Sequence, residues 1–426
     1  MKVRGTVRPP GDKSISHRAL MLAALAAGGK GASELEGLLT GADVKSTARV
    51  LRQLGADISS IRDAKVVVHA SRISHPASRL HCGNSGTTAR LMLGILAGQK
   101  FAATLTGDAS LRRRPMRRVT EPLRAMGAEI TEGRGDALPL TIRGGRLRAL
   151  TYTTPVASAQ IKSALLLAGL TGGVAVTIRE PYRSRDHTER LLAHLGLGLH
   201  ERGGAIVYEP APEGRSLVPA FRLAVPGDAS SAAFLVGAAA LAEGGELVIE
   251  NVGVNPTRTG FLVVLARMGA HVDRVNLRDA GGEPVADLVA RPGGGALRGT
   301  EVSAAEVPTL VDEVPMLAVL ASRAEGETVF REVGELRVKE SNRLELIAAN
   351  LRVLGVEAEA RGNDLHVCGT TRPPRGRVDT ARDHRLAMAF AVLGTLPGAD
   401  VRLSEKGSVA ISYPRFFRDL KAIGVG

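Results

Sequence analysis

The segment KESNRLELIAANLRVLGVEA, residues 339–358, sets the architecture because the chain repeats its pattern along its whole length. Its apolar residues Leu344, Ile347 and Leu351 recur at helical spacing, so they fall on one face of an amphipathic helix. Gly355 follows the last turn, where glycine readily adopts the left-handed conformation that ends a helix. The segment therefore predicts a helix that packs one face against a core and then leads into a strand.

Five further copies of this pattern occur, and the closing glycines of successive copies lie 69 to 86 residues apart. The copies are ADVKSTARVLRQLGADI (42–58), RRPMRRVTEPLRAMGAEI (113–130), SRDHTERLLAHLGLGL (184–199), NPTRTGFLVVLARMGAHV (255–272) and SYPRFFRDLKAIGV (412–425). A second, more apolar helix precedes each copy and is expected to begin near a capping side chain. These expected caps are Ser14 or Ser16, Asn84, Ser158, Asp228, Asp312 and Asp383.

The repeat predicts the domain organisation. Short β-rich runs such as ELVIENV (246–252) lie between the helices, so each unit reads strand–helix–strand–helix–strands over about 70 residues. Six such units exceed one ordinary domain, and we expect an α/β protein with two domains of three units each. The change from one domain to the other is expected near Pro226.

Composition narrows the function classes. The 426 residues include 56 Lys and Arg against 43 Asp and Glu, and the net charge of +13 favours anionic partners. Aromatic residues make up only 3% and Trp is absent, which argues against binding single strands by base stacking. Cys82 and Cys368 offer neither a disulfide framework nor metal-ligand spacing, and no apolar run has the length of a membrane span. We expect a cytoplasmic protein that needs no metal or nucleotide.

Basic and polar residues gather at the predicted helix starts, where free N–H groups and the helix dipole favour an anion. Any one of them could be a solvated surface group or a simple cap, but they recur at equivalent places in several units. They are Lys13, Ser14 and Arg18; Asn84, Ser85, Gly86 and Thr87; Arg114; Ser158, Gln160 and Lys162; Arg185; Lys339, Glu340 and Arg343; and Arg385. This distribution predicts a ligand, or a pair of ligands, with several negative charges.

Several motifs taken together resemble the enolpyruvyl transferases over essentially the whole chain. They are GDKSISHR (11–18), GNSGTTARL (83–91), RRRPM (112–116), SAQIKSALLLAGL (158–170), SRDHTERL (184–191), PTR (256–258), DE (312–313), RVKESNR (337–343) and DHRLAMAF (383–390). GDK, SAQIK, RDHTE and NPTR are most similar to the second bacterial class of the branch that uses shikimate-3-phosphate.

The resemblance implies two inside-out α/β barrel domains, each of three βαβαββ repeats. Residues 12–225 would form one domain, and residues 1–11 with 226–426 the other. It further implies an active site in the cleft between them, which closes around shikimate-3-phosphate and phosphoenolpyruvate without a cofactor or metal. The implied reaction transfers the enolpyruvyl group of phosphoenolpyruvate to the 5-hydroxyl of shikimate-3-phosphate.

Residue roles follow from the resemblance motif by motif. Asp312 is the implied base for the hydroxyl, Glu340 the proton donor to the methylene carbon, and Lys13 lies between both substrates. Shikimate-3-phosphate would bind Lys13, Ser14, Arg18, Ser158, Ala159 (backbone), Gln160, Arg185, Asp312 and Lys339. Phosphoenolpyruvate would bind Lys13, Gly86 (backbone), Arg114, Gln160, Arg343 and Arg385. Gly86 would also leave room for the inhibitor glyphosate.

Two positions depart from the family pattern. Ala159 stands where many members have serine, so one hydroxyl contact to the substrate phosphate is lost. Ile411 stands where some members carry a lysine in the active site, and Lys406, five residues earlier, is not assumed to replace it.

Three alternatives stay open. A UDP-N-acetylglucosamine enolpyruvyl transferase would share the fold and donor, although RRRPM lacks the cysteine usual there. An RNA-binding or RNA-end-processing protein would suit the repeats and the positive charge. A scaffold of repeats would leave the charged helix starts unexplained. We favour the shikimate-3-phosphate reaction, with no nucleic acid or membrane partner, in a monomer.

Overall fold

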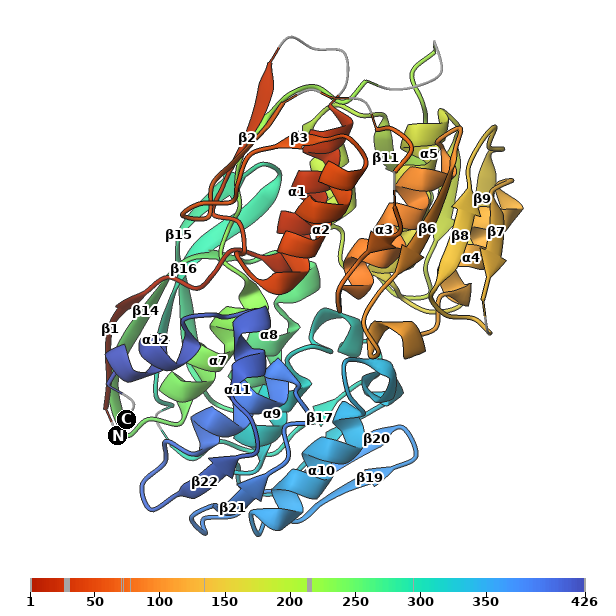
Figure 1. Ribbon diagram of the computed structural model, residues 1–426. Helices are drawn as coiled ribbons and strands as arrows, with labels where there is room; N and C mark the ends of the chain where they lie inside the picture. The colour runs from red at the N-terminus through yellow and green to blue at the C-terminus, as the bar shows by residue number, and fades with distance from the viewer. Residues whose placement is uncertain are drawn as a thin grey trace. The chain divides into compact units, whose positions relative to one another are not determined.

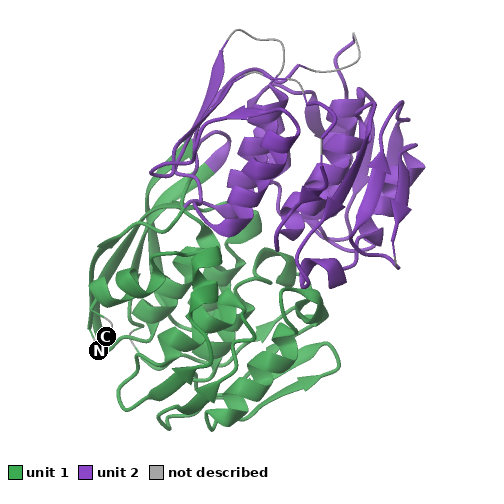
Figure 2. Cartoon of the chain, in the orientation of Figure 1, with its two compact units in different colours: residues 1–10, 226–279, 284–426 green, residues 11–225, 280–283 purple. Residues whose placement is uncertain are grey.

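The computed structural model describes residues 2–424 except 27–30, 70, 72, 77, 134, 213–216 and 294, and it divides into two compact units (Figure 2). Unit 1 comprises residues 1–10, 226–279 and 284–426, and unit 2 comprises residues 11–225 and 280–283. Each unit has a hydrophobic core of its own. Residue 425, at the end of the sixth predicted repeat, lies outside the described residues.

Unit 2 contains three four-stranded sheets with one strand pattern. In each sheet the first two strands pair in parallel and the last two are added antiparallel. In sheet order the strands are β13 (Arg222–Ala224), β2 (Ala32–Glu36), β4 (Val66–His69) and β3 (Asp57–Ile58); β5 (Leu80–His81), β6 (Ala102–Thr106), β8 (Leu140–Arg143) and β7 (Glu129–Glu132); and β9 (Leu150–Thr153), β10 (Val176–Arg179), β12 (Ala205–Tyr208) and β11 (Leu199–Arg202). In the second and third of these sheets a helix connects the two parallel strands, so each comes from one continuous βαβαββ stretch of chain. In the first sheet the parallel partner of β2 is β13, which follows much later in the chain.

Unit 1 keeps this order in two sheets and shortens it in the third. Its strands are β1 (Lys2–Val7), β14 (Gly244–Gly253), β16 (Glu283–Arg291) and β15 (His271–Ala280); β17 (Glu301–Val302), β18 (Glu327–Phe330), β20 (Asp364–Cys368) and β19 (Ala358–Arg361); and β21 (Arg375–Val378) with β22 (Asp400–Leu403). In the described residues the last sheet has only its parallel pair, so the sixth repeat is shorter than predicted.

Two strands are supplied out of chain order. The N-terminal strand β1 pairs in parallel with β14, with Lys2 opposite Gly244, and therefore belongs to unit 1. The strand β13 pairs in parallel with β2 and supplies the first strand of the first sheet in unit 2. The chain thus starts in unit 1, builds unit 2, and returns to unit 1 at Pro226.

The first helix of each repeat is apolar nearly all round and is buried in the interior of its unit, with the sheets outside (Figure 1). Such a helix is stable only when it is covered on every side. These central helices are α1 (Lys13–Leu25), α3 (Gly86–Ala97) and α5 (Ala159–Gly172) in unit 2, and α7 (Ala229–Ala240), α9 (Val314–Ala321) and α11 (His384–Leu393) in unit 1.

The second helix of each repeat bears one apolar face and covers the central helices. These helices are α2 (Ala42–Gln53), α4 (Arg117–Ala125), α6 (His187–His194), α8 (Gly260–Arg267), α10 (Arg343–Val353) and α12 (Phe416–Ala422). Short 3-10 turns precede four of them: η1 (Leu111–Arg113), η2 (Pro256–Arg258), η4 (Gly334–Val338) and η5 (Gly407–Ile411). A fifth turn, η3 (Val307–Thr309), lies between β17 and α9.

Three central helices begin at the expected cap and three at a neighbouring polar residue. Ser158, Asp228 and Asp383 occupy the predicted N-cap positions. Asp12, Ser85 and Glu313 occupy that position where Ser14 or Ser16, Asn84 and Asp312 were expected. The expected and observed caps lie close together in the chain, and the backbone conformation rather than the residue type selects between them.

The central helices α3 and α5 approach closely at Gly94. A Cβ atom placed on Gly94 would lie 2.1 Å from the carbonyl oxygen of Ala164 on α5. Only glycine therefore allows this helix spacing.

Replacing Gly94 with alanine should force α3 and α5 apart and lower the free energy of unfolding by about 2–3 kcal/mol. Urea unfolding followed by circular dichroism measures the loss. Gly145→Ala is the matched control, because a Cβ there meets no atom within 4 Å. Equal stability of the two variants would contradict the close helix approach.

Candidate active site

The predicted site residues divide between the two units, and each group lies at or near helix starts. Lys13, Ser14, Arg18, Gly86, Arg114, Ser158, Ala159, Gln160 and Arg185 lie in unit 2, whereas Asp312, Lys339, Glu340, Arg343 and Arg385 lie in unit 1. The first residues of α1, α3, α5, α10 and α11 all belong to these groups or adjoin them. Helix starts present free N–H groups and a positive dipole end, which suit anionic ligands.

In unit 2, Gln160 connects the starts of α5 and α3. Its Nε2 donates to Thr87 Oγ1 at 3.2 Å, and its Oε1 accepts from Arg90 Nη1 at 3.0 Å. Arg90 also donates to the carbonyl of Pro115 at 2.9 Å, just before α4. Arg90 therefore fixes the orientation of the Gln160 amide, a role that sequence analysis missed because it depends on contacts over long sequence separations.

Gly86 lies beside two guanidinium groups. A Cβ on Gly86 would lie 2.7 Å from Arg90 Nη1 and 3.4 Å from Arg114 Nη1. Arg114 is oriented by Asn84, whose Oδ1 accepts from Arg114 Nη2 at 2.5 Å and whose Nδ2 donates to Asp108 at 2.7 Å. The start of α3 thus combines glycine backbone with oriented arginine, an arrangement suited to a small anion.

Arg18 is buried and joins three helices. Its Nε donates to Thr188 Oγ1 at 2.6 Å, its Nη2 to Ser163 Oγ at 2.7 Å and its Nη1 to the Ser14 carbonyl at 3.0 Å. Burial lowers the pKa of Arg18 to about 10, so it remains positively charged at neutral pH. Lys13 contacts Asp43 of α2 at 3.3 Å with its side chain largely buried. Both cations are held in place by protein groups.

A buried polar chain ties α1 to the start of α3. His17 Nδ1 lies 2.6 Å from Thr47 Oγ1, which is 2.7 Å from Thr88 Oγ1, and Thr88 Oγ1 donates to Ser85 Oγ at 2.7 Å. Burial, with further contributions from Lys13 and Arg18, lowers the pKa of His17 well below its ordinary value. His17 is therefore neutral at physiological pH and acts as a structural hydrogen-bonding group.

Lys162, near the start of α5, pairs with acidic side chains. Its side chain is fully buried and pairs with Glu180 at 2.7 Å and Glu189 at 2.6 Å. The sequence grouped Lys162 with the anion-binding residues, and the structure instead places it between two acidic side chains. The difference arises because Glu180 and Glu189 come from a separate part of the chain.

In unit 1, Arg343 is the centre of an ion cluster. The fully buried guanidinium contacts Asp383 at 2.7 Å, Glu340 at 2.6 Å and Asp312 at 3.3 Å. Burial alone would lower the pKa of Arg343, but the Asp383, Glu340 and Asp312 carboxylates raise it overall, so its charge is permanent. The Asp383 side chain is fully buried, whereas Asp312 is 14% and Glu340 28% exposed. One arginine therefore holds two solvent-accessible carboxylates that can exchange protons with a ligand.

Arg385 extends this cluster. It donates to the Asp312 carbonyl at 3.1 Å and lies 3.6 Å from the Asp312 carboxylate and 3.8 Å from Glu313. Glu313 in turn accepts a hydrogen bond from Ser230, which also accepts one from Arg258 at 2.6 Å. The cluster thus joins the starts of α7, α9, α10 and α11.

Two further lysines, the predicted site residue Lys339 and Lys406, show ordinary contacts. Lys339 pairs with Glu335 at 2.9 Å one turn earlier. The Lys406 ammonium lies 5.7 Å from the centre of the Phe417 ring. Packing of Lys406 on this ring gives no sign that it replaces the lysine absent at Ile411.

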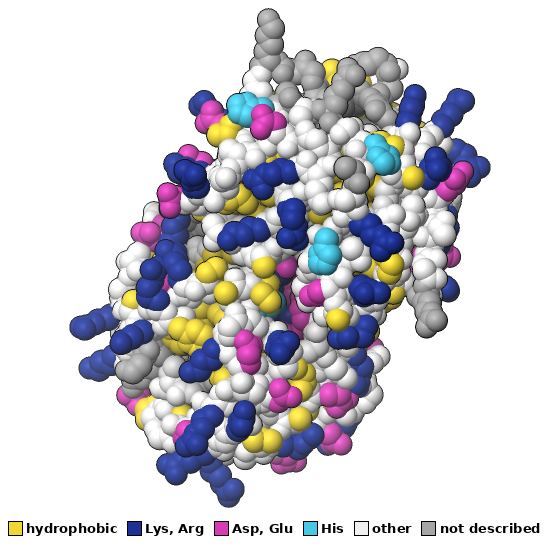
Figure 3. Space-filling model, viewed as in Figure 1, with side chains coloured by type: hydrophobic (Ala, Val, Ile, Leu, Met, Phe, Trp, Pro, Cys, Tyr) yellow, Lys and Arg dark blue, Asp and Glu magenta, His cyan; other side chains and the backbone are white. Residues whose placement is uncertain are grey.

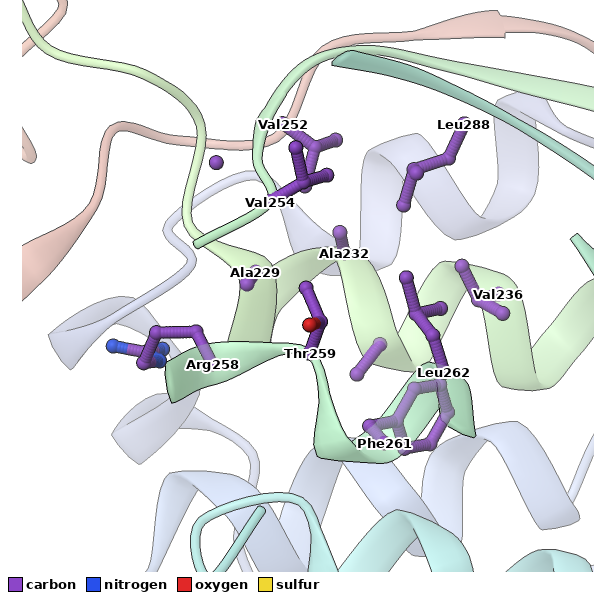
Figure 4. Close-up of a pocket in the computed structure, with 12 residues that line it drawn as sticks. Ala229, Ala232, Val236, Val252, Val254, Arg258, Thr259, Phe261, Leu262 and Leu288 are labelled. Carbon is purple, nitrogen blue, oxygen red and sulfur yellow. The ribbon is translucent and has the colours of Figure 1, made fainter. Parts of the chain in front are cut away.

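A small pocket of unit 1 lies beside Arg258. Arg258 lies at one end, Phe261 and Leu262 lie at the other, and Val252 and Val254 lie along one side (Figure 4). Only about 10 Å³ is open to the centre of a water molecule, which is room for about one water. The pocket is too small for either predicted substrate.

The structure can be searched for features of nucleic-acid, metal and membrane binding. On the visible face, Lys and Arg side chains are scattered over both units and outnumber those of Asp and Glu (Figure 3). Within the described ranges, no three His, Cys, Asp or Glu side chains form a metal-type group. No helix in the same part of the chain is long and apolar enough to span a bilayer.

Comparison with known proteins gives a consistent result. The family model of EPSP synthase (3-phosphoshikimate 1-carboxyvinyltransferase) matches residues 1–420. A 3-phosphoshikimate 1-carboxyvinyltransferase of Thermus thermophilus is 50% identical over 98% of this chain and 96% of the relative. That of Geobacillus kaustophilus is 45% identical over 99% of this chain and 98% of the relative.

Solved structures confirm the predicted fold. The EPSP synthase of Acinetobacter baumannii matches with a TM-score of 0.87 at 37% identity, covering 100% of this chain and 96% of that chain. The enolpyruvyl transferase NikO of Streptomyces tendae, 20% identical, shares the fold with a TM-score of 0.78 and covers 100% of this chain and 96% of that chain.

Asp383 provides a stability test of the ion cluster. Burial alone would raise the pKa of Asp383, but Arg343 lowers it below the ordinary value. Asp383→Asn should lower the free energy of unfolding at pH 7 by about 3 kcal/mol, because it breaks a buried ion pair. The charged form stabilises the fold above about pH 4, and this contribution fades as the pH falls through the lowered pKa.

The difference in urea unfolding between wild type and Asp383→Asn should therefore be largest at neutral pH and shrink below about pH 4. A difference that grew on acidification would argue against the ion pair as its source.

Proposed function

The chain belongs to the EPSP synthase family, and we propose that the residue groups of its two units act together on one pair of substrates. The enzyme transfers the enolpyruvyl group of phosphoenolpyruvate to the 5-hydroxyl of shikimate-3-phosphate, a step of the shikimate pathway. The products are 5-enolpyruvylshikimate-3-phosphate and phosphate.

The proposed chemistry uses the two accessible carboxylates of unit 1. Asp312 accepts the proton of the 5-hydroxyl, whose oxygen bonds to C2 of phosphoenolpyruvate, while Glu340 gives a proton to the methylene carbon. The tetrahedral intermediate then loses a proton from the new methyl group and phosphate from C2, which restores the double bond. The observation that carries this proposal is that Arg343 holds both carboxylates while leaving them open to solvent.

Binding is assigned to the helix starts. In the proposal, the start of α5, with Ser158, the Ala159 backbone and Gln160, binds the phosphate of shikimate-3-phosphate together with Arg185. The hydroxyl of Ser158 caps no N–H group of α5, which supports a role toward a ligand. Phosphoenolpyruvate is assigned to Lys13, the Gly86 backbone and Arg114 with Arg343 and Arg385, because guanidinium groups match carboxylate and phosphate geometry.

We further propose that the enzyme works as a monomer in the cytoplasm. All assigned residues come from one chain, so no second copy is needed to complete the site. Cys82 and Cys368 are free thiols, and burial raises the pKa of Cys82 to about 12. Unreactive reduced thiols suit a reducing compartment.

Asp312→Ala and Glu340→Ala should each reduce kcat about 10²- to 10⁴-fold, because each removes a proton-transfer group. Phosphate release from phosphoenolpyruvate in the presence of shikimate-3-phosphate measures the effect. Glu345→Gln is the matched control: Glu345 also pairs with an arginine, Arg337, near the start of α10, but is assigned no role. Control-like activity in the two alanine variants would refute the assigned roles.

The same assay tests the acceptor. Release of phosphate only with UDP-N-acetylglucosamine would show that the enzyme is a UDP-N-acetylglucosamine enolpyruvyl transferase. Release with neither acceptor would reject the transferase reaction. We expect release with shikimate-3-phosphate alone.

Gly86→Ala should weaken inhibition by glyphosate more than tenfold, because the added methyl group reaches toward Arg90 and Arg114. Inhibition of phosphate release at fixed phosphoenolpyruvate measures this, with Gly145→Ala as the control in open space. If the unmodified enzyme resisted millimolar glyphosate while binding phosphoenolpyruvate normally, the steric explanation would be wrong.

A further inference from the structure

A buried ion triad in unit 2 takes no part in the mechanism above. It consists of Lys162 on α5, Glu180 after β10 and Glu189 on α6. Their side chains are 0%, 4% and 10% exposed, respectively. Because a buried ion cluster costs desolvation energy, hydrophobic residues of similar size would often serve folding as well. The other contacts of these three residues therefore indicate what the triad does besides stabilise the fold.

Glu180 accepts hydrogen bonds from two separate segments of chain. Its Oε1 accepts from the Ser158 N–H at 3.3 Å and from the Ser184 hydroxyl at 2.5 Å. Its Oε2 accepts from the Ser184 N–H at 3.3 Å. Ser158 begins the run Ser158–Gln160 at the start of α5, and Ser184 directly precedes Arg185. One carboxylate thus connects the two segments assigned to shikimate-3-phosphate.

Lys162 reduces the repulsion that the negative charge of Glu180 would exert on an anion bound nearby. Its Nζ lies 2.7 Å from Glu180 and also donates to the Ser184 carbonyl at 3.4 Å. Burial alone would lower the pKa of Lys162, but Glu189 and Glu180 raise it overall, so Lys162 stays charged. The ammonium offsets the negative charge of Glu180, and the carboxylate can accept all three hydrogen bonds in its ionised form.

Glu189 differs from Glu180 in one respect that matters. It pairs with Lys162 at 2.6 Å and its side chain is almost as deeply buried. The hydrogen bonds from Ser158 and Ser184, however, go to Glu180. Both glutamates therefore pair with Lys162, and Glu180 is the one that bridges the two segments.

We propose that Glu180 is a positioning residue for shikimate-3-phosphate, which holds Ser158–Gln160 and Arg185 at the spacing that the substrate requires. Lys162 supports it by balancing its charge. This inference rests on the proposed function of the same site.

Glu180→Gln tests the proposal. Glutamine keeps the shape and one acceptor oxygen, but its amide nitrogen cannot accept, so the bridge between the segments loses at least one hydrogen bond. The KM for shikimate-3-phosphate should rise about tenfold, while kcat and the KM for phosphoenolpyruvate stay within about twofold. Calorimetric binding of shikimate-3-phosphate alone should weaken by the same factor.

Glu189→Gln is the matched control, because it removes the same charge beside Lys162 and leaves the hydrogen bonds of Glu180 to both segments in place. All three kinetic constants of this variant should stay within about twofold of the wild type. Equal effects of the two substitutions, or no effect of Glu180→Gln, would overturn the positioning role. If Glu180→Gln does not fold, Ser184→Ala decides: loss of one hydroxyl donor should raise the KM for shikimate-3-phosphate about threefold, and an unchanged KM would overturn the proposal.

The wild type separates this inference from the function on which it rests. Absence of phosphate release with shikimate-3-phosphate in the wild type would reject the proposed function. An active wild type with an unaltered Glu180→Gln variant would reject only the positioning role.

Discussion

Each unit of the molecule has to bury three helices that are apolar on nearly every side, and the rest of the structure follows from this constraint. The helices satisfy it by packing against one another, closely enough at Gly94 that no side chain fits. Sheets and amphipathic helices then cover the outside of the group. The residues assigned to the substrates lie at or near helix starts in both units, at central helices such as α1 and α5 and at amphipathic helices such as α10.

The repeat could be predicted from sequence because its signals are local. Glycines after each amphipathic helix and the apolar helices before them set the period, and strand patterns complete the unit. The exchange of β1 and β13 could not be predicted from these signals, since it depends on pairing between segments far apart in the chain, as between Lys2 and Gly244 or between Glu34 and Arg222. The observed caps Asp12, Ser85 and Glu313 lie close in the chain to the predicted ones, because the local backbone conformation decides which of several neighbouring polar residues caps the helix.

The positions of the candidate site residues could be predicted from the sequence better than the side chains that each of them contacts. The charged residues at helix starts are visible in the sequence, but what holds them is not. Asp383 looked like a simple cap, and the structure shows it as the buried anchor of Arg343. Lys162 looked like a ligand-binding cation, and the structure shows it enclosed by two glutamates. In each case the deciding partner is distant in the chain, where periodicity and motifs carry no information.

The out-of-order strands bear on how the protein is made. Unit 2 has received nearly all its chain, including every strand of its three sheets, once β13 leaves the ribosome, so it can fold while synthesis continues. β1 is translated well before its partner β14, which emerges only after residue 244. At about 5–20 residues per second, this strand waits on the order of ten to fifty seconds with its edges unpaired. Arg4 and Lys2 along the strand supply charge of the kind that discourages such an edge from pairing with a neighbouring nascent chain.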